Sequence, residues 1–432
     1  MIPIVILAFL IQVVLSIKRP VYALCWLLLV KILIPDNVRF PFVDISLNTS
    51  CSIALFLGWI ISRVAKPNSK NKLIKFLLFF FVYCTISIFL TFSNVPVSIQ
   101  FKTYIMYVVI QLLPIIVMIF VVRTEEDVKL LIKIFSFAVF ICSLYSIVCF
   151  FLQIPYPYNN WINAQYGSRD GNLDNMFNVS MAGIMGRCMG TATSGTYDYG
   201  MVISSLFICI GAIYYVLKKK CLLYLWILVG LNVLCTTRRS PILTAIVFIV
   251  ILFVFENKAN IRKKIKYIIY SFLLILLCVN IFPVLEDFKN IIESTLFFWN
   301  ESMAEKNEVT GSSVSYRTYQ LNRTISLIKE NPFFGNGWGA CYYKDKYPDM
   351  NGWESIVFTT LMQFGYIGAL MWIFLFYNFY KYSCRSGFKV LSVAFMASGM
   401  TLCLFTDSIY PFYIFFGSVL INKFSLLSVK KK

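Results

Sequence analysis

The side chains best suited to chemistry are arginines that stand near acids and aromatic residues in polar stretches between long apolar runs. A guanidinium stays charged and forms paired hydrogen bonds with phosphate oxygens, so several arginines converging on one cavity would suit a diphosphate attached to a lipid. The arginines of this kind are Arg187, Arg238, Arg239, Arg317 and Arg323. The simpler interpretation, in which an arginine at the end of a span reaches toward the headgroups, is preferred for Arg238, and a binding role is preferred for Arg239 and Arg317.

The residue types available for proton transfer are limited, because the chain has no histidine. This excludes Ser-His-Asp and Cys-His catalysis and the usual zinc sites. General acid or base catalysis must then come from Asp, Glu, Tyr or Lys, whose pKa values shift with burial and neighbouring charges. The sequence also has no GxxxxGK[ST] phosphate-binding loop, which argues against an ATPase pump. We therefore expect no metal ion and no cofactor.

The elements that position these residues must be membrane-spanning helices. Hydrophobic residues make up 59% of the chain and charged residues 14%, and the mean hydropathy is +0.75. Apolar runs recur at about the 17 to 25 residues that a helix needs to cross the bilayer. The first run has no basic region before it and no cleavage site after it, so we expect a retained helix and not a signal peptide. The sequence predicts an all-α polytopic membrane protein with about 12 to 13 transmembrane helices.

The expected spans follow one another along the whole chain. They are Ile2–Ile17, Tyr22–Ile34, Ile45–Ile61, Phe76–Phe92, Tyr104–Val122, Ile134–Leu152, Met201–Leu217, Leu222–Cys235, Pro241–Phe255, Ile268–Phe282, Ile356–Phe379, Val390–Phe405 and Phe412–Phe424.

The basic residues indicate the orientation of these spans, because short loops rich in Lys and Arg stay cytoplasmic. Such loops, together with the C-terminal Lys430 to Lys432, all fall on one side of the membrane. We therefore expect a cytoplasmic C-terminus and two long loops outside. The net charge of +19 is mostly an orientation signal and gives no reason to expect a nucleic-acid partner.

This orientation divides the chain into five expected segments. They are the N-terminal transmembrane helices 1–152, a first outer loop 153–200, the central transmembrane helices 201–282, a large outer catalytic loop 283–355 and the C-terminal transmembrane helices 356–432.

The large outer loop contains a predicted amphipathic helix over Val314–Lys329, where Leu321, Ile325 and Ile328 recur at helical spacing. The sequence NPFFGNGWG follows it. Its proline disfavours helix at the preceding residue, and its three glycines permit tight turns and close backbone approach. Such a turn could present backbone N–H groups to a phosphate or a sugar, or could be only a turn.

The order of these motifs resembles that of a known superfamily. The motifs are T-R-R-S-P between two spans, then Y-R-x-x-x-x-N-R-x-x-x-L-I-K-E-N-P-F-F-G-N-G-W-G, then a helix that begins after E-S and continues L-x-x-F-G-Y-I-G. Upstream, Arg187-x-x-Gly190-Thr191 is followed by Tyr199-Gly200. Between about residues 180 and 380, the chain resembles the O-antigen ligase and repeat-unit polymerase superfamily of bacterial envelopes, and most of all a Wzy-type O-antigen or capsule polymerase.

The resemblance implies a GT-C-like, metal-independent glycosyltransferase in the bacterial inner membrane, with an extracytoplasmic active site. Its substrate would be an undecaprenyl-diphosphate-linked oligosaccharide held among membrane lipids. The growing glycan would leave its lipid diphosphate and join the non-reducing end of a lipid-linked repeat unit. A chain-length regulator is a further expected partner.

The resemblance also suggests a role for each candidate residue. Ligases of this superfamily have a histidine where this chain has Glu354, which favours a polymerase. Glu354 would accept the proton of the attacking sugar hydroxyl, while Arg317 and Arg239 stabilise the departing diphosphate. An acid before a helix can also simply favour the helix dipole. The expected substrate-binding residues are Arg187, Arg323, Arg238, Trp338, Tyr342, Tyr343, Trp353 and Tyr199.

Two other functions remain open. A ligase would transfer the finished polymer to another acceptor by the same chemistry. A transporter or flippase of lipid-linked sugars would be expected to show broken or charged helices in two related halves. The sequence has no convincing internal repeat, and its long asymmetric outer loop favours a site at the membrane surface.

Overall fold

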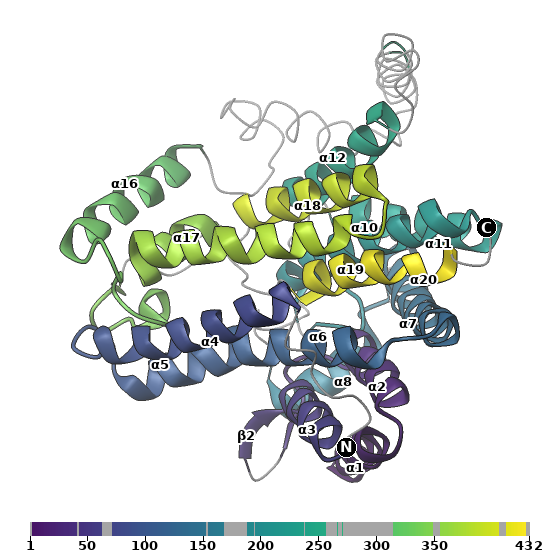
Figure 1. Ribbon diagram of the computed structural model, residues 1–432, viewed down its shortest axis with the longest axis horizontal. Coiled ribbons are helices and arrows are strands. Elements are labelled where there is room, and N and C mark those ends of the chain that lie inside the picture. Colours follow the sequence, from purple (N-terminus) through teal and green to yellow (C-terminus); the bar gives the residue numbers. More distant parts are fainter. Residues whose placement is uncertain are drawn as a thin grey trace. The chain divides into compact units, whose positions relative to one another are not determined.

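The computed structural model describes residues 2–40, 43–62, 71–152, 154–167, 188–193, 195–236, 238–255, 266, 270, 314–348, 355–405 and 412–428. Within these ranges the chain is an all-α polytopic membrane protein (Figure 1). The two described strands, β1 (Arg39–Phe40) and β2 (Val43–Ser46), form one short antiparallel hairpin.

Four described helices are long and apolar enough to cross a membrane. These are α4 (Lys72–Leu90), α7 (Glu125–Phe151), α10 (Thr196–Leu217) and α17 (Ile356–Cys384). Eight shorter apolar helices accompany them. These are α1 (Ile2–Lys18), α2 (Pro20–Leu33), α3 (Leu47–Ser62), α6 (Ile110–Val121), α11 (Lys220–Cys235), α12 (Arg239–Phe255), α18 (Lys389–Leu404) and α19 (Phe412–Lys423).

Each of these helices falls on one of the expected spans. The expected span Ile268–Phe282 lies outside the described residues except for Tyr270. The remaining described helices are short or polar: α5 (Val97–Tyr104), the π-helical turn η1 (Ile105–Val109), α8 (Pro157–Tyr166), α16 (Val314–Glu330), the 3-10 turn η3 (Ala340–Tyr342) and α20 (Ser425–Ser428).

The chain forms two compact units. Unit 1 comprises residues 1–139, 319–389 and 403–432, and unit 2 comprises residues 140–318 and 390–402. In unit 1, α17 runs beside α4 and α19 (Figure 1). In unit 2, α10 packs against α11 and α12.

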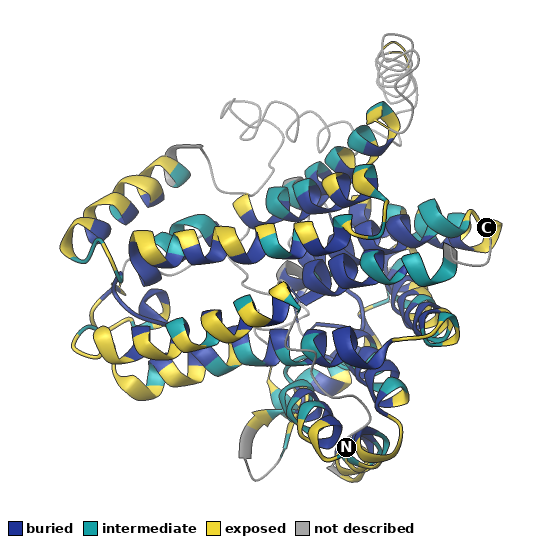
Figure 2. Cartoon of the chain, in the orientation of Figure 1, coloured by how far each residue is buried: buried dark blue, intermediate teal, exposed yellow. Residues whose placement is uncertain are grey.

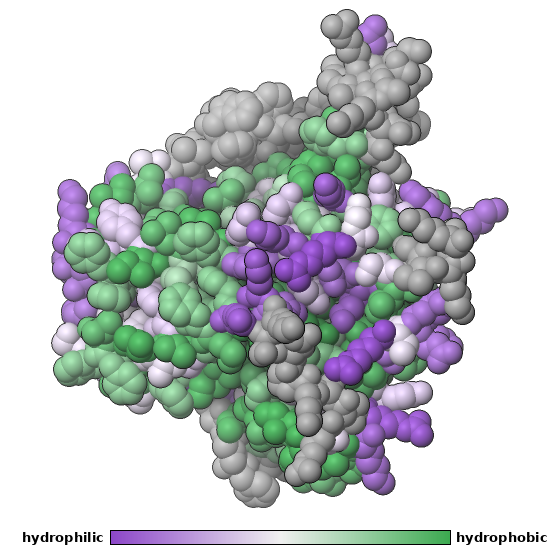
Figure 3. Space-filling model, in the orientation of Figure 1, coloured by the Kyte–Doolittle hydropathy of each residue, from purple (hydrophilic) through white to green (hydrophobic). Residues whose placement is uncertain are grey.

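Large apolar side chains on the outer face of α4 are exposed, including Leu78 at 60%, Phe79 at 59% and Phe89 at 66%. Figure 3 shows a largely apolar surface over α4 and α5. In a membrane protein this is the surface that lipid tails cover, because lipid replaces the protein interior as the apolar environment. The inner face of the same helix buries Leu77, Phe80 and Cys84.

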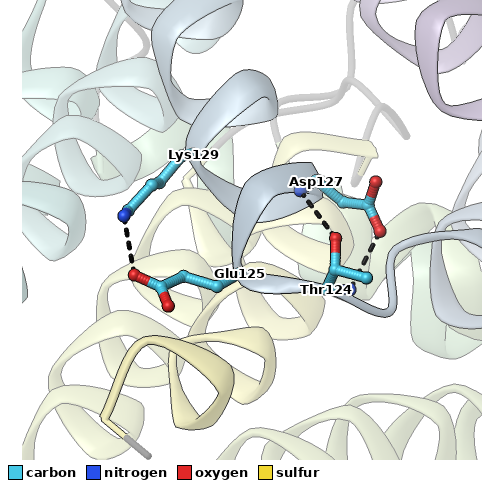
Figure 4. Close-up of polar contacts among 4 residues, drawn as sticks. All are labelled: Thr124, Glu125, Asp127 and Lys129. Carbon is cyan, nitrogen blue, oxygen red and sulfur yellow. Dashed lines mark hydrogen bonds and ion pairs between the residues drawn. The ribbon is translucent and has the colours of Figure 1, made fainter. Parts of the chain in front are cut away.

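Helix α7 begins nine residues before the expected span at Ile134, because its polar first turns are stabilised by a capping box (Figure 4). The Thr124 N–H donates to Asp127 Oδ2 at 2.9 Å, and the Asp127 N–H donates to Thr124 Oγ1 at 3.1 Å. Glu125 and Lys129 form an ion pair one turn apart at 2.6 Å. The two bonds between Thr124 and Asp127 satisfy N–H groups that the first helical turn otherwise leaves without partners.

Candidate functional site

Helix α16 carries two of the candidate arginines and confirms the helix predicted over Val314–Lys329. Of the expected apolar face, only Ile328 is buried, at 4% exposure. Leu321 and Ile325 are 39% and 44% exposed, whereas Gln320 and Thr324 are fully buried. Figure 2 shows that α16 carries both exposed and buried residues along its length. The apolar spacing therefore predicted the helix, but it did not identify which of its faces packs against the protein.

The two arginines of α16 are both half-buried. Arg317 lies in the first turns, within unit 2, and Arg323 lies beyond Thr318, within unit 1. The Arg323 guanidinium donates to Ser326 Oγ at 3.4 Å. A half-buried guanidinium on a surface helix remains accessible to an anionic ligand while its stem is held by packing.

The glycine loop, Asn331–Gly339, follows α16 as predicted, since the helix ends at Glu330. Gly335, Gly337 and Gly339 all have positive φ, at 69°, 102° and 73°. A Cβ atom at Gly335 would lie 2.5 Å from the backbone of α17. These glycines therefore allow the left-handed turns and the close approach of two backbones that the sequence predicted.

Helix α17 is broken where this loop meets it. Gly365 has φ 62° and ψ −163°, a conformation that is essentially restricted to glycine. A break frees backbone carbonyls from their helical partners. Here the N–H of Asn336 donates to the Met362 carbonyl, and the N–H of Gly337 donates to the Gln363 carbonyl, each at 2.9 Å. The loop thus supplies donors to the end of the first segment of α17.

The loop also supplies hydrogen-bond acceptors to the first N–H groups of the second segment of α17. The N–H of Tyr366 donates to the Pro332 carbonyl at 2.8 Å, and the N–H of Ile367 donates to the Phe333 carbonyl at 3.2 Å. Irregular backbone inside a membrane protein is tolerated where other protein groups satisfy it in this way. The glycine loop and the break of α17 are therefore one structural feature.

A buried asparagine secures the loop at its centre. The Asn336 amide donates to the carbonyls of Leu327 at 3.2 Å and Met362 at 3.3 Å. Its Oδ1 accepts from Asn331 Nδ2 at 3.0 Å and from the Tyr347 hydroxyl at 3.2 Å. Burial raises the pKa of Tyr347 to about 12, so its phenol keeps the proton that it donates.

A buried glutamine, Gln100 of α5, secures the other side of the loop. Its Oε1 accepts from the Trp338 N–H at 3.2 Å and from Thr91 Oγ1 at 2.9 Å. Its Nε2 donates to the carbonyls of Thr91 and Val95 at 3.1 and 3.0 Å. All the hydrogen-bonding capacity of this amide is used, which is the condition under which a buried polar group rigidifies a core.

The structure places Trp338 in the core and not at an open surface. It is 1% exposed, its Nε1 donates to Ser87 Oγ at 2.9 Å, and its ring contacts the rings of Tyr104 and Phe364. The indole is thus enclosed by protein. The expected sugar-stacking role does not fit this geometry, and Trp338 instead anchors the glycine loop.

The other aromatic candidates of the large loop differ in exposure. Tyr342 is 44% exposed and Tyr343 is partly buried. Trp353 and Glu354 lie outside the described residues. Glu354 directly precedes Ser355, the extended residue that caps the N-terminus of α17. Glu354 therefore stands beside the start of that helix along the chain, and its role as a base remains a prediction.

Unit 2 holds the upstream motif, which packs as a buried turn. Arg187 lies outside the described residues, but Cys188 follows it and its N–H donates to the Cys235 carbonyl at 3.2 Å. Asn159 Nδ2 donates to the carbonyls of Gly190 and Thr193, each at 3.0 Å. Any side chain at Gly190 would collide with its neighbours, because a Cβ there would lie 2.6 Å from Tyr199 Cζ.

Tyr199 is fully buried and donates its hydroxyl proton to Asn232 Oδ1 at 3.1 Å. Asn232 Nδ2 donates to the carbonyls of Ser143 and Leu228 at 3.1 and 3.0 Å. One asparagine of α11 therefore joins α7, α10 and the upstream motif. Sequence reasoning did not identify this residue, because an isolated Asn in an apolar run carries no motif signal.

Replacing Asn232 by Leu is expected to destabilise the protein by about 3 kcal/mol, because it leaves the buried Tyr199 hydroxyl and Ser143 carbonyl without a partner. The midpoint of thermal unfolding in detergent would fall. Asn378→Leu is the control, since that half-buried residue donates its amide to the Phe374 carbonyl of its own helix. Equal midpoints for the two variants would contradict a central role for Asn232.

The structure brings Arg238 next to the Tyr199-Gly200 pair. A Cβ at Gly200 would lie 3.1 Å from Arg238 Cδ. The Tyr199-Gly200 pair and the T-R-R-S-P motif are distant in sequence, and they thus lie side by side in unit 2. Helix α12 starts at Arg239, whose backbone alone is described. Asp198, in the first turn of α10, is only 5% exposed and is an acid close to this meeting point along the chain.

Comparison with known proteins covers the later motifs of the chain. The elements described above define a multi-pass membrane protein in which a glycine loop docks into a broken helix. Residues 223–373, about a third of the chain, match the family model described as O-Antigen ligase. No curated protein matches the chain.

The matched segment runs from α11 through α12, α16 and the glycine loop into α17. Residues 223–373 are therefore a domain of the O-antigen ligase/polymerase superfamily, which confirms the resemblance. The family indicates a glycosyl-transferring enzyme of the O-antigen pathway that acts on lipid-linked oligosaccharides in a membrane.

Proposed function

We propose that the protein is a Wzy-type polysaccharide polymerase. It transfers the growing glycan from undecaprenyl diphosphate to the non-reducing end of a lipid-linked repeat unit. The observation that carries this proposal is the family match together with an acid, Glu354, directly before the N-cap of α17. The superfamily's ligases have a histidine at this position, so the acid favours polymerisation over ligation.

The proposed reaction is a single displacement. A sugar hydroxyl of the incoming repeat unit attacks the anomeric carbon of the growing chain, and the bond from that carbon to the diphosphate oxygen breaks. Glu354 takes the hydroxyl proton, and the lipid diphosphate leaves with the bonding electron pair. Arg317 and Arg239 stabilise its charge, so the scheme requires no metal ion.

The other candidates would bind substrate around this centre. Arg187, Arg238 and Arg323 would contact phosphate or sugar oxygens, and Tyr342, Tyr343 and Trp353 would contact sugar rings. Tyr199 would act through the packing of the upstream motif, since it is fully buried. The distribution of basic loops supports an extracytoplasmic site in the bacterial inner membrane, with the C-terminus in the cytoplasm.

The test is a polysaccharide profile of the source bacterium after deletion of the gene and complementation with wild type. Single repeat units on the acceptor after deletion, with long chains restored by complementation, would support the polymerase. Long lipid-linked chains that accumulate without transfer would support the alternative ligase. Repeat units that remain on the cytoplasmic side would support a transporter or flippase.

Arg317→Ala is expected to lower the initial rate of polymerisation by about 10² to 10³, because one preorganised charge at the leaving group is lost. Purified protein in nanodiscs with a synthetic lipid-diphosphate repeat unit provides the measurement. The matched control is Lys329→Ala, an exposed cation in the last turn of the same helix. A similar loss in both variants would show a general charge effect and contradict a specific role for Arg317.

A further inference from the structure

We propose that Gln363 is a positioning residue, which holds the first segment of α17 in the orientation that catalysis requires. The inference rests on the proposed function, because that segment, residues 356–364, begins two residues after Glu354. Gln363 is fully buried and lies at the break of α17. It contacts no substrate in this proposal and acts only through the glycine loop.

The first segment cannot be oriented by helix continuity alone. At Gly365 the backbone leaves the helical conformation, so the longer second segment does not dictate the direction of the first. The carbonyls of Met362 and Gln363 bond to loop N–H groups in place of the next helical turn. The direction of residues 356–364 is therefore determined by the glycine loop.

Gln363 joins the segment to the loop region by three hydrogen bonds. Its carbonyl accepts from the Gly337 N–H at 2.9 Å, and its Oε1 accepts from the Gly339 N–H at 3.0 Å. Its Nε2 donates to Cys341 Sγ at 2.9 Å. One residue thus fixes the segment to Gly337 and Gly339 of the loop and to Cys341 just beyond it, which leaves little freedom for rotation about the break.

The loop is itself immobilised on the far side. Gln100 accepts from the Trp338 N–H, and the Trp338 indole donates to Ser87 of α4. Buried amides that satisfy every partner favour one arrangement, because alternatives leave polar groups unpaired in a low-dielectric interior. The connection therefore runs from α4 and α5 through the loop and Gln363 to the start of α17.

The consequence for the reaction follows from geometry. A base displaced by about 1 Å from its reacting proton can cost about 10² in rate. Loss of the Gln363 side-chain bonds would let the segment before the break, and the acid preceding it, sample other orientations. Substrate affinity depends on the arginines and should change little. We therefore expect a lower kcat at an unchanged KM.

The experiment compares Gln363→Met with Gln12→Met in the full-length protein in nanodiscs. Gln12 is the matched control, since it is also fully buried in an apolar helix of unit 1 and also makes two side-chain hydrogen bonds, to Ser16 and Ala23. Hydrogen–deuterium exchange reports the anchoring, and polymerisation of a lipid-diphosphate repeat unit reports kcat and KM. Both variants remove two side-chain hydrogen bonds of a buried amide, so an effect of that loss alone would appear in both.

In Gln363→Met we expect amides of residues 336–339 and 356–364 to exchange at least about tenfold faster. We expect kcat to fall by about 10 to 100-fold with KM unchanged. Neither change is expected in Gln12→Met.

Unchanged exchange in Gln363→Met would overturn the anchoring, and faster exchange with normal kcat would overturn the positioning role. Wild type that is inactive on lipid-linked repeat units would instead refute the proposed function, while the exchange data still decide the anchoring.

Discussion

Replacing Glu354 by Gln is expected to lower the initial rate of polymerisation by about 10² to 10⁴, the usual contribution of a general base. The amide keeps the size and polarity of the side chain but cannot accept the hydroxyl proton. A sugar hydroxyl is a weak nucleophile, so loss of its proton acceptor should slow the bond-forming step directly. In cells the variant should leave short glycans, and with purified protein it should consume the lipid-diphosphate repeat unit slowly.

The control must separate lost chemistry from lost folding. Glu330→Gln removes an exposed acid at the end of α16 and should leave the rate unchanged. Expression, detergent extraction and the unfolding midpoint of Glu354→Gln should equal those of wild type. Near-normal polymer length in such a folded variant would refute the base assignment. The exposed Asp345, or Asp349 nearby in the chain, would then be the next candidate bases.

The transmembrane helices could be predicted from the sequence because their signal is local. A run of apolar residues specifies a span wherever its neighbours lie. The start of α7 was not predicted, because its first turns are polar and their stability comes from the Thr124 and Asp127 capping bonds. The sequence TEED contains that signal, because Thr124 and Asp127 stand three residues apart just before the apolar run.

The docking of the glycine loop could be predicted only in part. Gly335, Gly337 and Gly339 indicated turns and close approach, and the structure confirms both. Nothing local in L-x-x-F-G-Y-I-G requires a break at Gly365, since an isolated glycine within an apolar helix is usually tolerated. The break depends on partners more than twenty residues away, so it becomes apparent only in the tertiary structure.

The role of Trp338 shows the same limit. A tryptophan near the membrane interface can either stack against a sugar ring or pack in the core, so the sequence did not decide between these two roles. Trp338 is 1% exposed and donates a hydrogen bond to Ser87, which shows that it is a core residue. For Arg187 and Glu354, which lie outside the described residues, the resemblance still supplies the whole argument.

Gly365→Ala should be among the most damaging substitutions in the chain. A Cβ at this residue would lie 2.6 Å from the Pro332 carbonyl oxygen and 2.7 Å from the Gly335 nitrogen, which are backbone atoms that cannot rotate away. The backbone conformation itself is strained for any residue with a side chain. To admit the methyl group, the loop must move and lose the bond from the Tyr366 N–H to Pro332.

We expect Gly365→Ala to cost about 3 to 5 kcal/mol from strain and overpacking together. The unfolding midpoint should fall sharply, and polymer synthesis should fall with it because the first segment of α17 loses its anchor. Gly387→Ala separates the two causes: Gly387 also has positive φ, at 87°, but a Cβ there meets nothing within 4 Å. That control should cost only about 1 to 2 kcal/mol, the penalty of the backbone conformation alone. If both variants unfolded at the same midpoint, the contact between the glycine loop and the break of α17 would contribute nothing to stability, and the anchoring of the helix start would have to come from elsewhere.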